Sequence, residues 1–289
     1  MSSPRRVVTS SMLGLSMPDI DRWSERVIDV LGQNPGPFTG PGTNTYIVGS
    51  GERRLLLDAG QGVEEHVHLL ARALDELAGG ATIESIALTH AHPDHMGGLE
   101  KVVERFRPDT VKKKPWPEWD RGASFETIED DAELRVEGAT LRAIHTPGHA
   151  RDHLCYYLVE EKAVFTGDVV LGAGTTVIPR DGDLSDYLAS LRRLLELDLE
   201  VIYPAHGPAI RDPYGKINEY LAHRALREEQ ILEGMAAGLR AVSDLVRRIY
   251  VDVPEWLYAA AGVSVEAHLR KLEKEGVVVR SGEDWDLLS

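Results

Sequence analysis

The sequence predicts an α/β fold in which helices cover packed β-sheets, and two observations lead to this prediction. First, β-rich runs alternate with amphipathic runs of helical period in both halves of the first 218 residues. Second, each half has enough apolar runs to bury a sheet under helices, an arrangement that favours stacked layers. Beyond residue 219 the pattern changes to helices and a short hairpin, which predicts a smaller second domain.

The first half predicts a strand, a hairpin and then alternating helices and strands. Runs 43–48 and 54–58 flank Gly49-Ser50-Gly51, whose residues favour a tight turn. Residues 63–77 place apolar side chains at helical spacing and end at Gly79-Gly80, a sequence typical of a helix C-terminus. The other elements expected here are strands at 23–30 and 83–88 and a short helix from Gly98 to Phe106.

The second half repeats this alternation and leads into the C-terminal segment. Short strands are expected at 134–136, 140–145, 154–159, 163–166 and 201–203, and an amphipathic helix at 184–195. Charged helical runs follow at 220–235, 241–250 and 263–275, and two short strands close the chain at 276–280 and 285–288. Three helices and a hairpin are the order of a winged-helix module. We therefore expect a flexible tail at 1–20, a main domain at 21–218 and a winged-helix-like domain at 219–289.

Composition limits the compartment and the partners. No stretch approaches the roughly 18 uncharged apolar residues that span a bilayer, so no membrane role is expected. The single cysteine, Cys155, excludes an intramolecular disulfide and favours a reducing compartment. Arg5, Arg6 and several serines resemble a transit peptide faintly, although a plain polar tail is favoured. The predicted location is intracellular, in the cytoplasm or the mitochondrial matrix.

Charge argues against duplex nucleic acid as a partner. The formal net charge is −15, which repels polyanions at long range. The C-terminal segment from His223 to Ser289 holds nine Arg and Lys against twelve Asp and Glu, so no duplex DNA binding is expected. One local exception is the run from Lys112 to Trp119, where three lysines precede two tryptophans that could stack on bases. The favoured alternative is a proline-broken surface loop whose tryptophans cover the edge of the core.

Seven histidine and aspartate residues form the strongest functional signal. The run His90-Ala91-His92-Pro93-Asp94-His95 follows an apolar strand and offers imidazole and carboxylate ligands, the set preferred by zinc and similar metals. Three single residues, His149, Asp168 and His206, also follow β-rich runs, each beside a glycine or proline. A strand end can hold such side chains convergent on one point, so the sequence predicts a metal site.

In this order and spacing, the seven residues resemble the ligand series of the metallo-β-lactamase superfamily. The resemblance implies a four-layer αββα sandwich, with residues 21–218 as the catalytic domain and a dinuclear site at one edge. It also implies that His90, His92 and His149 hold one metal, that Asp94, His95 and His206 hold the other, and that Asp168 bridges them. The expected cofactors are two Zn²⁺ ions, with iron or manganese as alternatives.

Asp168 narrows the function that this resemblance implies. Antibiotic-degrading dizinc members typically have cysteine at that position, whereas aspartate resembles the thioesterase, glyoxalase II-like and nuclease branches. Segments such as Gly42-Thr43-Asn44-Thr45-Tyr46 and Phe165-Thr166-Gly167-Asp168 resemble a branch of mitochondrial single-strand endoribonucleases and fungal acyl-carrier-protein thioesterases. Two metals would supply a bridging hydroxide that Asp94 orients, so no protein nucleophile is needed. Ala150 and the pair Ala91 and Pro93 depart from the commonest pattern and would alter hydrogen bonds around the ligands.

The sequence therefore predicts a dinuclear zinc-dependent hydrolase, with single-stranded RNA as the favoured substrate. The alternative is a thioesterase that acts on an acyl carrier protein or a small acyl-thiol. A less favoured alternative is a metal-stabilised binding protein without catalysis.

Substrate contacts are expected from a few further residues, each with an alternative. Asn44 would reach the substrate or hold its own turn, and His223 and Arg224 would clamp an anion or form a surface salt bridge. His153 is expected behind the metal ligands. The remaining histidines are expected in packing or solvent, namely His66, His68, His145 and His268.

Overall fold

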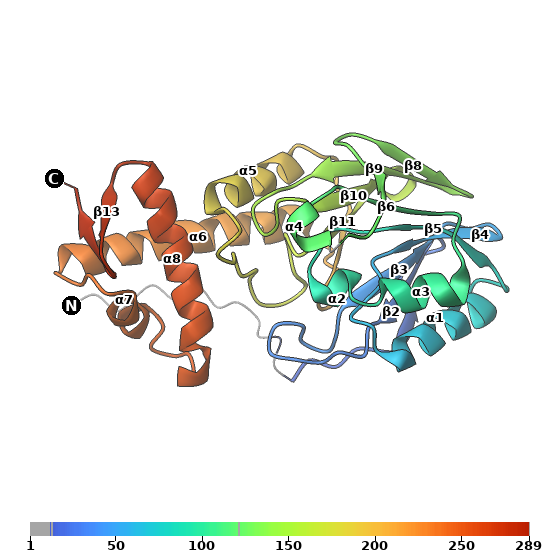
Figure 1. Ribbon diagram of the computed structural model, residues 1–289, viewed down its shortest axis with the longest axis horizontal. Helices are drawn as coiled ribbons and strands as arrows, with labels where there is room; N and C mark the ends of the chain where they lie inside the picture. The colour runs from blue at the N-terminus through green and yellow to red at the C-terminus, as the bar shows by residue number, and fades with distance from the viewer. Residues whose placement is uncertain (1–11, 13, 121, 289) are drawn as a thin grey trace.

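The computed structural model describes residues 12, 14–120 and 122–288 and contains two large sheets packed face to face (Figure 1). The first sheet has seven strands in chain order, in which β1 to β4 are antiparallel neighbours and β4 to β7 are parallel. Its strands are β1 (Ile20–Arg22), β2 (Val27–Leu31), β3 (Asn44–Val48), β4 (Arg53–Leu57), β5 (Thr82–Ala87), β6 (Thr110–Lys113) and β7 (Glu126–Thr127).

The second sheet has five strands in the order β12-β11-β10-β9-β8. Its β11–β12 pair is parallel, and the other neighbouring pairs are antiparallel. The strands are β8 (Glu133–Val136), β9 (Ala139–His145), β10 (Leu154–Leu158), β11 (Ala163–Gly167) and β12 (Val201–Pro204), with the 3-10 turn η1 (Val159–Glu161) between β10 and β11. These strands confirm the predicted runs of the second half to within two residues at either end.

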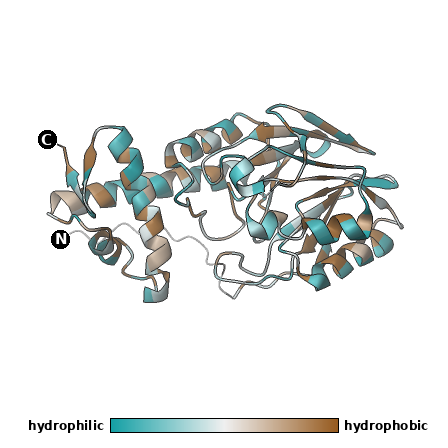
Figure 2. Ribbon diagram, in the orientation of Figure 1, coloured by the Kyte–Doolittle hydropathy of each residue, from teal (hydrophilic) through white to brown (hydrophobic). Residues whose placement is uncertain are grey.

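Three apolar clusters define four layers. One lies between the sheets and joins residues of both, such as Tyr46 and Phe165. A second packs the first sheet against α1 (Glu64–Glu76) and α3 (Leu99–Phe106), and a third packs the second sheet against α5 (Leu184–Leu195) and α6 (Pro213–Ala236). Hydrophobic and hydrophilic residues alternate along these helices, as expected where one face is buried (Figure 2). The αββα sandwich is therefore confirmed.

The C-terminal segment forms a small module with its own core, on the left in Figure 1. It comprises α7 (Val242–Ile249), the 3-10 turn η2 (Glu255–Leu257), α8 (Tyr258–Lys274) and the hairpin of β13 (Val278–Ser281) and β14 (Asp284–Leu287). Helix α6 belongs to both parts, because Ile217 packs under the second sheet and Ile231 packs in the module. The predicted boundary after residue 218 thus falls within one continuous helix.

Three predicted element boundaries were wrong for local reasons. The expected strand 23–30 begins only at Val27, because Trp23 and Ser24 donate to the Val27 carbonyl in a turn that separates β2 from β1. Helix α6 begins at Pro213 instead of residue 220, since Asp212 caps it by accepting from Gly215. Helix α8 begins at Tyr258 instead of residue 263, and its first turn is rich in alanine, the best helix former.

The predicted tail at 1–20 lies largely outside the described residues, and its last residue, Ile20, belongs to β1. Within the described part of the chain, no helix has the length and apolar character needed to cross a membrane.

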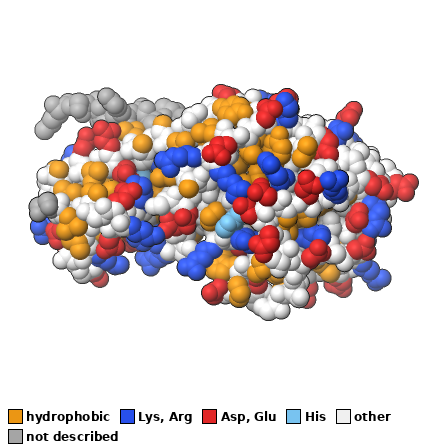
Figure 3. Space-filling view, turned by 90° about the horizontal axis from the view of Figure 1, so that it is seen from above, with side chains coloured by type: hydrophobic (Ala, Val, Ile, Leu, Met, Phe, Trp, Pro, Cys, Tyr) orange, Lys and Arg blue, Asp and Glu red, His pale blue; other side chains and the backbone are white. Residues whose placement is uncertain are grey.

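The Lys112–Trp119 run does not form an open basic surface. Lys112 and Lys114 pair with Glu126 and Glu129, while Lys113 is fully buried with its ammonium 2.6 Å from carboxylates of both Asp120 and Asp152. The Trp116 indole is buried against the loops of the histidine run. Acidic and basic side chains also intermingle over the face seen in Figure 3. The loop that covers the core edge is therefore the better description.

Replacing Lys113 with alanine should destabilise the fold by roughly 3–5 kcal/mol, because it leaves two buried carboxylates without a counter-charge. The matched control is Lys114→Ala, which removes a more exposed ion pair and should cost at most about 1 kcal/mol. Urea denaturation followed by circular dichroism measures both. Equal losses in the two variants would contradict the role of the buried lysine.

Candidate metal centre

All seven predicted metal ligands meet at one edge of the sandwich. The carboxyl ends of β4 and β5 in the first sheet and of β9, β11 and β12 in the second sheet point to this edge, since β9 runs parallel to β11 across β10. Short loops after these strands carry the ligands. Asp94 and His95 lie on the one-turn helix α2 (Pro93–Met96), which Pro93 begins. The His/Asp cluster comprises His90, His92, Asp94, His95, His149, Asp168 and His206.

Three imidazoles converge on one point of the His/Asp cluster. His92 Nδ1 lies 3.0 Å from His90 Nε2 and 2.9 Å from His149 Nε2. The outer ring nitrogens of the other two are fixed, because His90 Nδ1 lies 3.0 Å from Thr89 Oγ1 and His149 Nδ1 donates to the Val177 carbonyl at 2.8 Å. The inner nitrogens therefore present lone pairs to a shared centre, a geometry that could hold a metal ion.

Asp168 faces two groups of ligands at once. Its Oδ1 lies 3.4 Å from His95 Nε2 and 3.2 Å from His206 Nε2, while its Oδ2 lies 3.4 Å from His149 Nε2. Asp94 Oδ2 is 3.4 Å from His95 Nε2 and 3.3 Å from His206 Nε2. The carboxylate of Asp168 thus stands between a three-histidine group and a group of Asp94, His95 and His206.

The cluster has the unsatisfied donor atoms that a metal site requires. His95 Nε2 and Asp168 Oδ1 are buried, face each other at 3.4 Å and form no hydrogen bond. Unpaired buried polar atoms are costly, and ligation of a cation satisfies them. Three overlapping sets of residues have ligand atoms within 4.8 Å of one another. The residues present therefore fit metal ions.

The pKa shifts separate the two groups. Burial and the neighbouring histidines hold the pKa of His90 well below its usual range and lower that of His92 to about 4, so both imidazoles are neutral and could hold a metal ion. Burial also disfavours the charged form of His206, but Asp168 and Asp94 outweigh it and raise the pKa to about 9. Without metal, protons bound to the histidines of the second group balance the negative charge of the two carboxylates. A bound cation would supply this positive charge in their place.

Sequence reasoning missed Asp58, which supports the cluster from the end of β4. Its Oδ2 accepts from His95 Nδ1 at 2.8 Å, and its two oxygens accept from the Thr89 amide and hydroxyl. Asp58 has a left-handed backbone with φ of 62°, which turns the chain directly after the strand. The available signal was its position at a strand end before Ala59-Gly60, like the other cluster loops.

His153 supports the cluster from behind, as predicted. Its Nε2 accepts the Asp168 amide at 3.2 Å, and its Nδ1 lies 2.9 Å from Thr146 Oγ1. Gly167 makes this contact possible, because φ is 48° there and a side-chain Cβ would meet the His153 ring at 2.5 Å. His153 therefore fixes the backbone that carries Asp168.

The three predicted substrate contacts are all buried. Asn44 is buried, and its amide donates to the carbonyls of Pro204 and Gly207 at 2.8 Å, so it holds the loop of His206. His223 and Arg224 are buried in α6, and Arg224 donates to the Thr176 carbonyl. The placement of Asn44 favours its turn-holding alternative, whereas Arg224 matches neither alternative because burial removes it from both substrate and solvent.

A pocket of about 700 Å³ opens over the cluster and reaches His92, Asp94, His149, Asp168 and His206. Its lining also includes an apolar wall of Phe38, from the loop before β3, with Val253, Trp256 and Leu257 of the C-terminal module. Phe38 and Trp256 are exposed, at 59% and 57%. Among the described residues that line this pocket there is no lysine or arginine.

The departures at Ala91 and Ala150 have a packing reason. Both are buried in a small cluster with Trp116, against which Met96 and Trp119 pack. The small side chains let the indole of Trp116 pack directly on both ligand loops. The Trp119 ring in turn lies 5.3 Å from the His92 ring.

Comparison with known proteins identifies the family. A model described as the metallo-beta-lactamase superfamily matches residues 38–206, which include the complete His/Asp cluster. The chain belongs to the metallo-beta-lactamase superfamily. A second model, the beta-lactamase associated winged helix domain, matches residues 241–285 and so confirms the winged-helix character of the C-terminal module. Together with the cluster, this membership makes the chain a metal-dependent hydrolase.

Curated relatives from two groups cover nearly the whole chain. A beta-lactamase-like protein 2 homolog of Caenorhabditis elegans is 39% identical over 90% of this chain and 88% of its own length. The Drosophila melanogaster homolog is 38% identical over 90% and 92%. An atrochrysone carboxyl ACP thioesterase of Aspergillus novofumigatus is 40% identical over 90% of this chain and 78% of its own. These relatives confirm the resemblance seen in the sequence.

Solved structures share the fold. A metallo-beta-lactamase family protein of Thermus thermophilus has a TM-score of 0.75 at 23% identity, covering 94% of this chain and 99% of its own. A beta-lactamase domain protein of Burkholderia ambifaria has a TM-score of 0.81 at 18% identity, covering 97% of both. A protein solved in a di-iron-bound form has a TM-score of 0.50 at 29% identity, covering 63% of this chain and 93% of its own.

Removing bound metal with a chelator should lower the melting temperature by on the order of 10 °C, because ligation at about a thousandfold excess over Kd contributes about 4 kcal/mol. Differential scanning calorimetry before and after chelation, and after re-addition of zinc or iron, measures this change. The variant Asp168→Ala should lose most of the response. A melting temperature that is indifferent to chelator in the metal-loaded protein would contradict the prediction.

Replacing Asp58 with asparagine should weaken metal binding about 10- to 100-fold, because the carboxylate that orients His95 is lost. The control is Asp75→Asn, an equal charge change at an exposed position of α1. Competition with a chelating dye measures the affinities. An unchanged affinity in Asp58→Asn would show that His95 needs no such support.

Proposed function

We propose that the chain is a dinuclear metal-dependent hydrolase that cleaves acyl thioesters. The observation that carries this proposal is the apolar wall facing the His/Asp cluster, formed by Phe38, Trp256 and their neighbours. An apolar wall without cations suits an acyl chain and offers nothing to balance phosphates. The thioesterase names of the fungal relatives support the same substrate class.

The proposed ligands follow the two groups of the cluster. His90, His92 and His149 would hold one ion, Asp94, His95 and His206 the second, and Asp168 would contact both through its separate oxygens. The distances of 2.9 to 3.4 Å between their donor atoms support this division. Zinc suits the ligand set, and iron is supported by the relative solved with two iron ions.

Two bound metal ions would supply a water of lowered pKa and polarise the thioester carbonyl. The chain itself would position the reactants. Asp94 would hold and orient the attacking water through its carboxylate, which Thr43 Oγ1 steadies by donating to Oδ2 at 3.3 Å. The apolar wall would bind the acyl group and exclude bulk water from the carbonyl carbon. The thiol would leave toward the open side of the pocket.

Single-stranded RNA is the second candidate and was the favoured substrate from sequence. It is supported by two indoles beside the cluster, Trp256 on the pocket wall and Trp119 against His92, which are suited to stack on bases. The pairing of Lys112, Lys113 and Lys114 with carboxylates counts against it. We therefore place RNA second.

A reducing compartment, either the cytoplasm or the mitochondrial matrix, is also proposed. The single thiol, Cys155, is buried in the core, and burial raises its pKa to about 12, which makes it unreactive. Stability therefore does not depend on oxidation of this residue.

Metal-loaded protein should hydrolyse a long-chain acyl thioester, and Asp94→Ala should lower kcat about 100- to 10,000-fold because the group that orients the water is lost. The release of thiol, followed with a chromogenic disulfide, measures turnover. The matched control is Asp109→Ala, a carboxylate lost from an exposed surface position.

The same preparations should be incubated with single-stranded RNA. RNA cleavage that Asp94→Ala abolishes, without thioester turnover, would overturn the thioesterase proposal in favour of the second candidate. Two bound metals with neither activity would revive the interpretation as a binding protein.

A further inference from the structure

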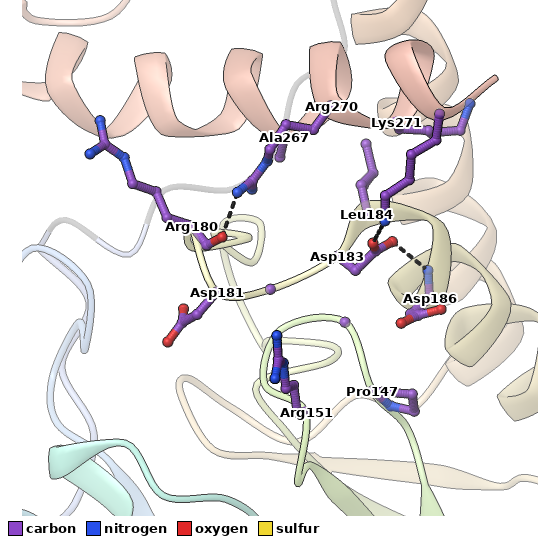
Figure 4. Close-up of a pocket in the computed structure, with 13 residues that line it drawn as sticks. Pro147, Arg151, Arg180, Asp181, Asp183, Leu184, Asp186, Ala267, Arg270 and Lys271 are labelled. Carbon is purple, nitrogen blue, oxygen red and sulfur yellow. Dashed lines mark hydrogen bonds and ion pairs between the residues drawn. The ribbon is translucent and has the colours of Figure 1, made fainter. Parts of the chain in front are cut away.

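A second pocket of about 340 Å³ lies on the other side of the loop that carries His149. Figure 4 shows it between α8 of the C-terminal module and the loop of Pro147 and Arg151. The volume is at the lower end of the range for ligand sites, roughly 300–1,000 Å³. We call it the α8 pocket.

The α8 pocket and the pocket over the His/Asp cluster share a wall. His149 lines the cluster pocket, while the preceding residue, Gly148, lines the α8 pocket. Likewise Val177 lines the pocket over the cluster, whereas Arg180 and Asp181, a few residues later in the chain, line the α8 pocket. The two pockets are therefore lined by neighbouring residues of the same two segments.

Cations dominate the lining of the α8 pocket although the whole chain is strongly acidic. Five basic residues line it, against the three carboxylates of Asp181, Asp183 and Asp186. The basic residues are Arg151, Arg180, Arg270, Lys271 and Lys274. Whether these cations can bind an anion depends on which of them are left without an acidic partner in the protein.

Part of this charge is neutralised within the protein. Lys274 pairs with Asp183, Lys271 pairs with Glu228 and Glu275, and Arg180 lies 3.5 Å from Glu266. These pairs anchor α8 and the loop before α5 around the pocket.

Two guanidinium groups remain for a ligand. Arg270 donates to the carbonyls of Pro179 and Arg180, which orient its side chain without neutralising its charge. Arg151 is exposed and, among the described residues, has no ion pair. In Figure 4 the Arg151 guanidinium points toward the gap below α8, whereas the carboxylates of Asp181 and Asp186 point outward on opposite sides. An arginine presents a planar fork of donors that matches phosphate oxygens.

We propose that the α8 pocket binds a phosphate group on the thiol carrier of the substrate, as in a coenzyme A thioester. This inference rests on the proposed thioesterase function. It concerns the thiol carrier, which is the part of the substrate that the apolar wall does not bind. Arg151 and Arg270 contact the phosphate, and the acyl group lies over the His/Asp cluster. The two pockets thus divide the substrate between an apolar and an anionic end.

Paired esters with the same acyl group test the proposal. Benzoyl-coenzyme A carries phosphates, whereas benzoyl-N-acetylcysteamine has the same thioester without them. In Arg151→Gln the KM for benzoyl-coenzyme A divided by the KM for benzoyl-N-acetylcysteamine should rise about tenfold, since a charge-assisted contact to phosphate is lost. Arg72→Gln, the same charge change on exposed α1, should leave the ratio unchanged. Equal KM ratios in wild type and Arg151→Gln would overturn the proposal.

A binding measurement keeps this test separate from thioesterase activity. Adenosine 3′,5′-bisphosphate, which has no thiol to reach the metals, is titrated into the full-length protein by calorimetry. Binding that weakens about tenfold in Arg151→Gln and not in Arg72→Gln supports the phosphate site, even if neither ester is hydrolysed. No binding to the wild type overturns it. If Arg151→Gln weakens only single-stranded RNA binding, the site serves a polynucleotide and the carrier proposal fails.

Discussion

The constraint on which the rest of the structure depends is the meeting of strand ends from two sheets at one edge. The strand directions within the two sheets bring the carboxyl ends of five strands to this edge. Each of these strands is followed by a short loop that carries a polar side chain. Asp168 links the halves, because one oxygen faces His149 and the other faces His95 and His206. The packed core between the two sheets keeps these loops close enough for their polar side chains to meet.

The C-terminal module contributes residues to the pocket over this centre. Helix α6 contributes to the core under the second sheet and to the core of the module, so the two parts are joined by a rigid element. The module supplies Trp256 to the pocket over the cluster and Arg270 to the α8 pocket. Under the proposed function, residues of the module and of the sandwich would bind the substrate together, while the candidate metal ligands all lie in the sandwich.

Sequence patterns predicted the layers well and single side-chain roles poorly. Period and turn residues located the strands and helices, and failed at Trp23 and Ser24 because a short turn leaves little trace in an apolar pattern. The basic-patch alternative for Lys113 fails because the lysine is buried with Asp120 and with Asp152, which lies 39 residues further along the chain. Asp58 was missed for the same reason, since its partner His95 lies 37 residues further along.

The sequence by itself determined the family, the sandwich and the types of ligand. The reason is that the order and spacing of seven histidines and aspartates after β-rich runs can be recognised directly in the chain. Only the tertiary structure decided what surrounds them. It buried Asn44 and Arg224 away from the pocket, set an apolar wall opposite the cluster, and left Arg151 facing a second pocket. The physical reason is that ligand identity is a local property of the chain, whereas the polarity of a pocket depends on segments that only folding brings together.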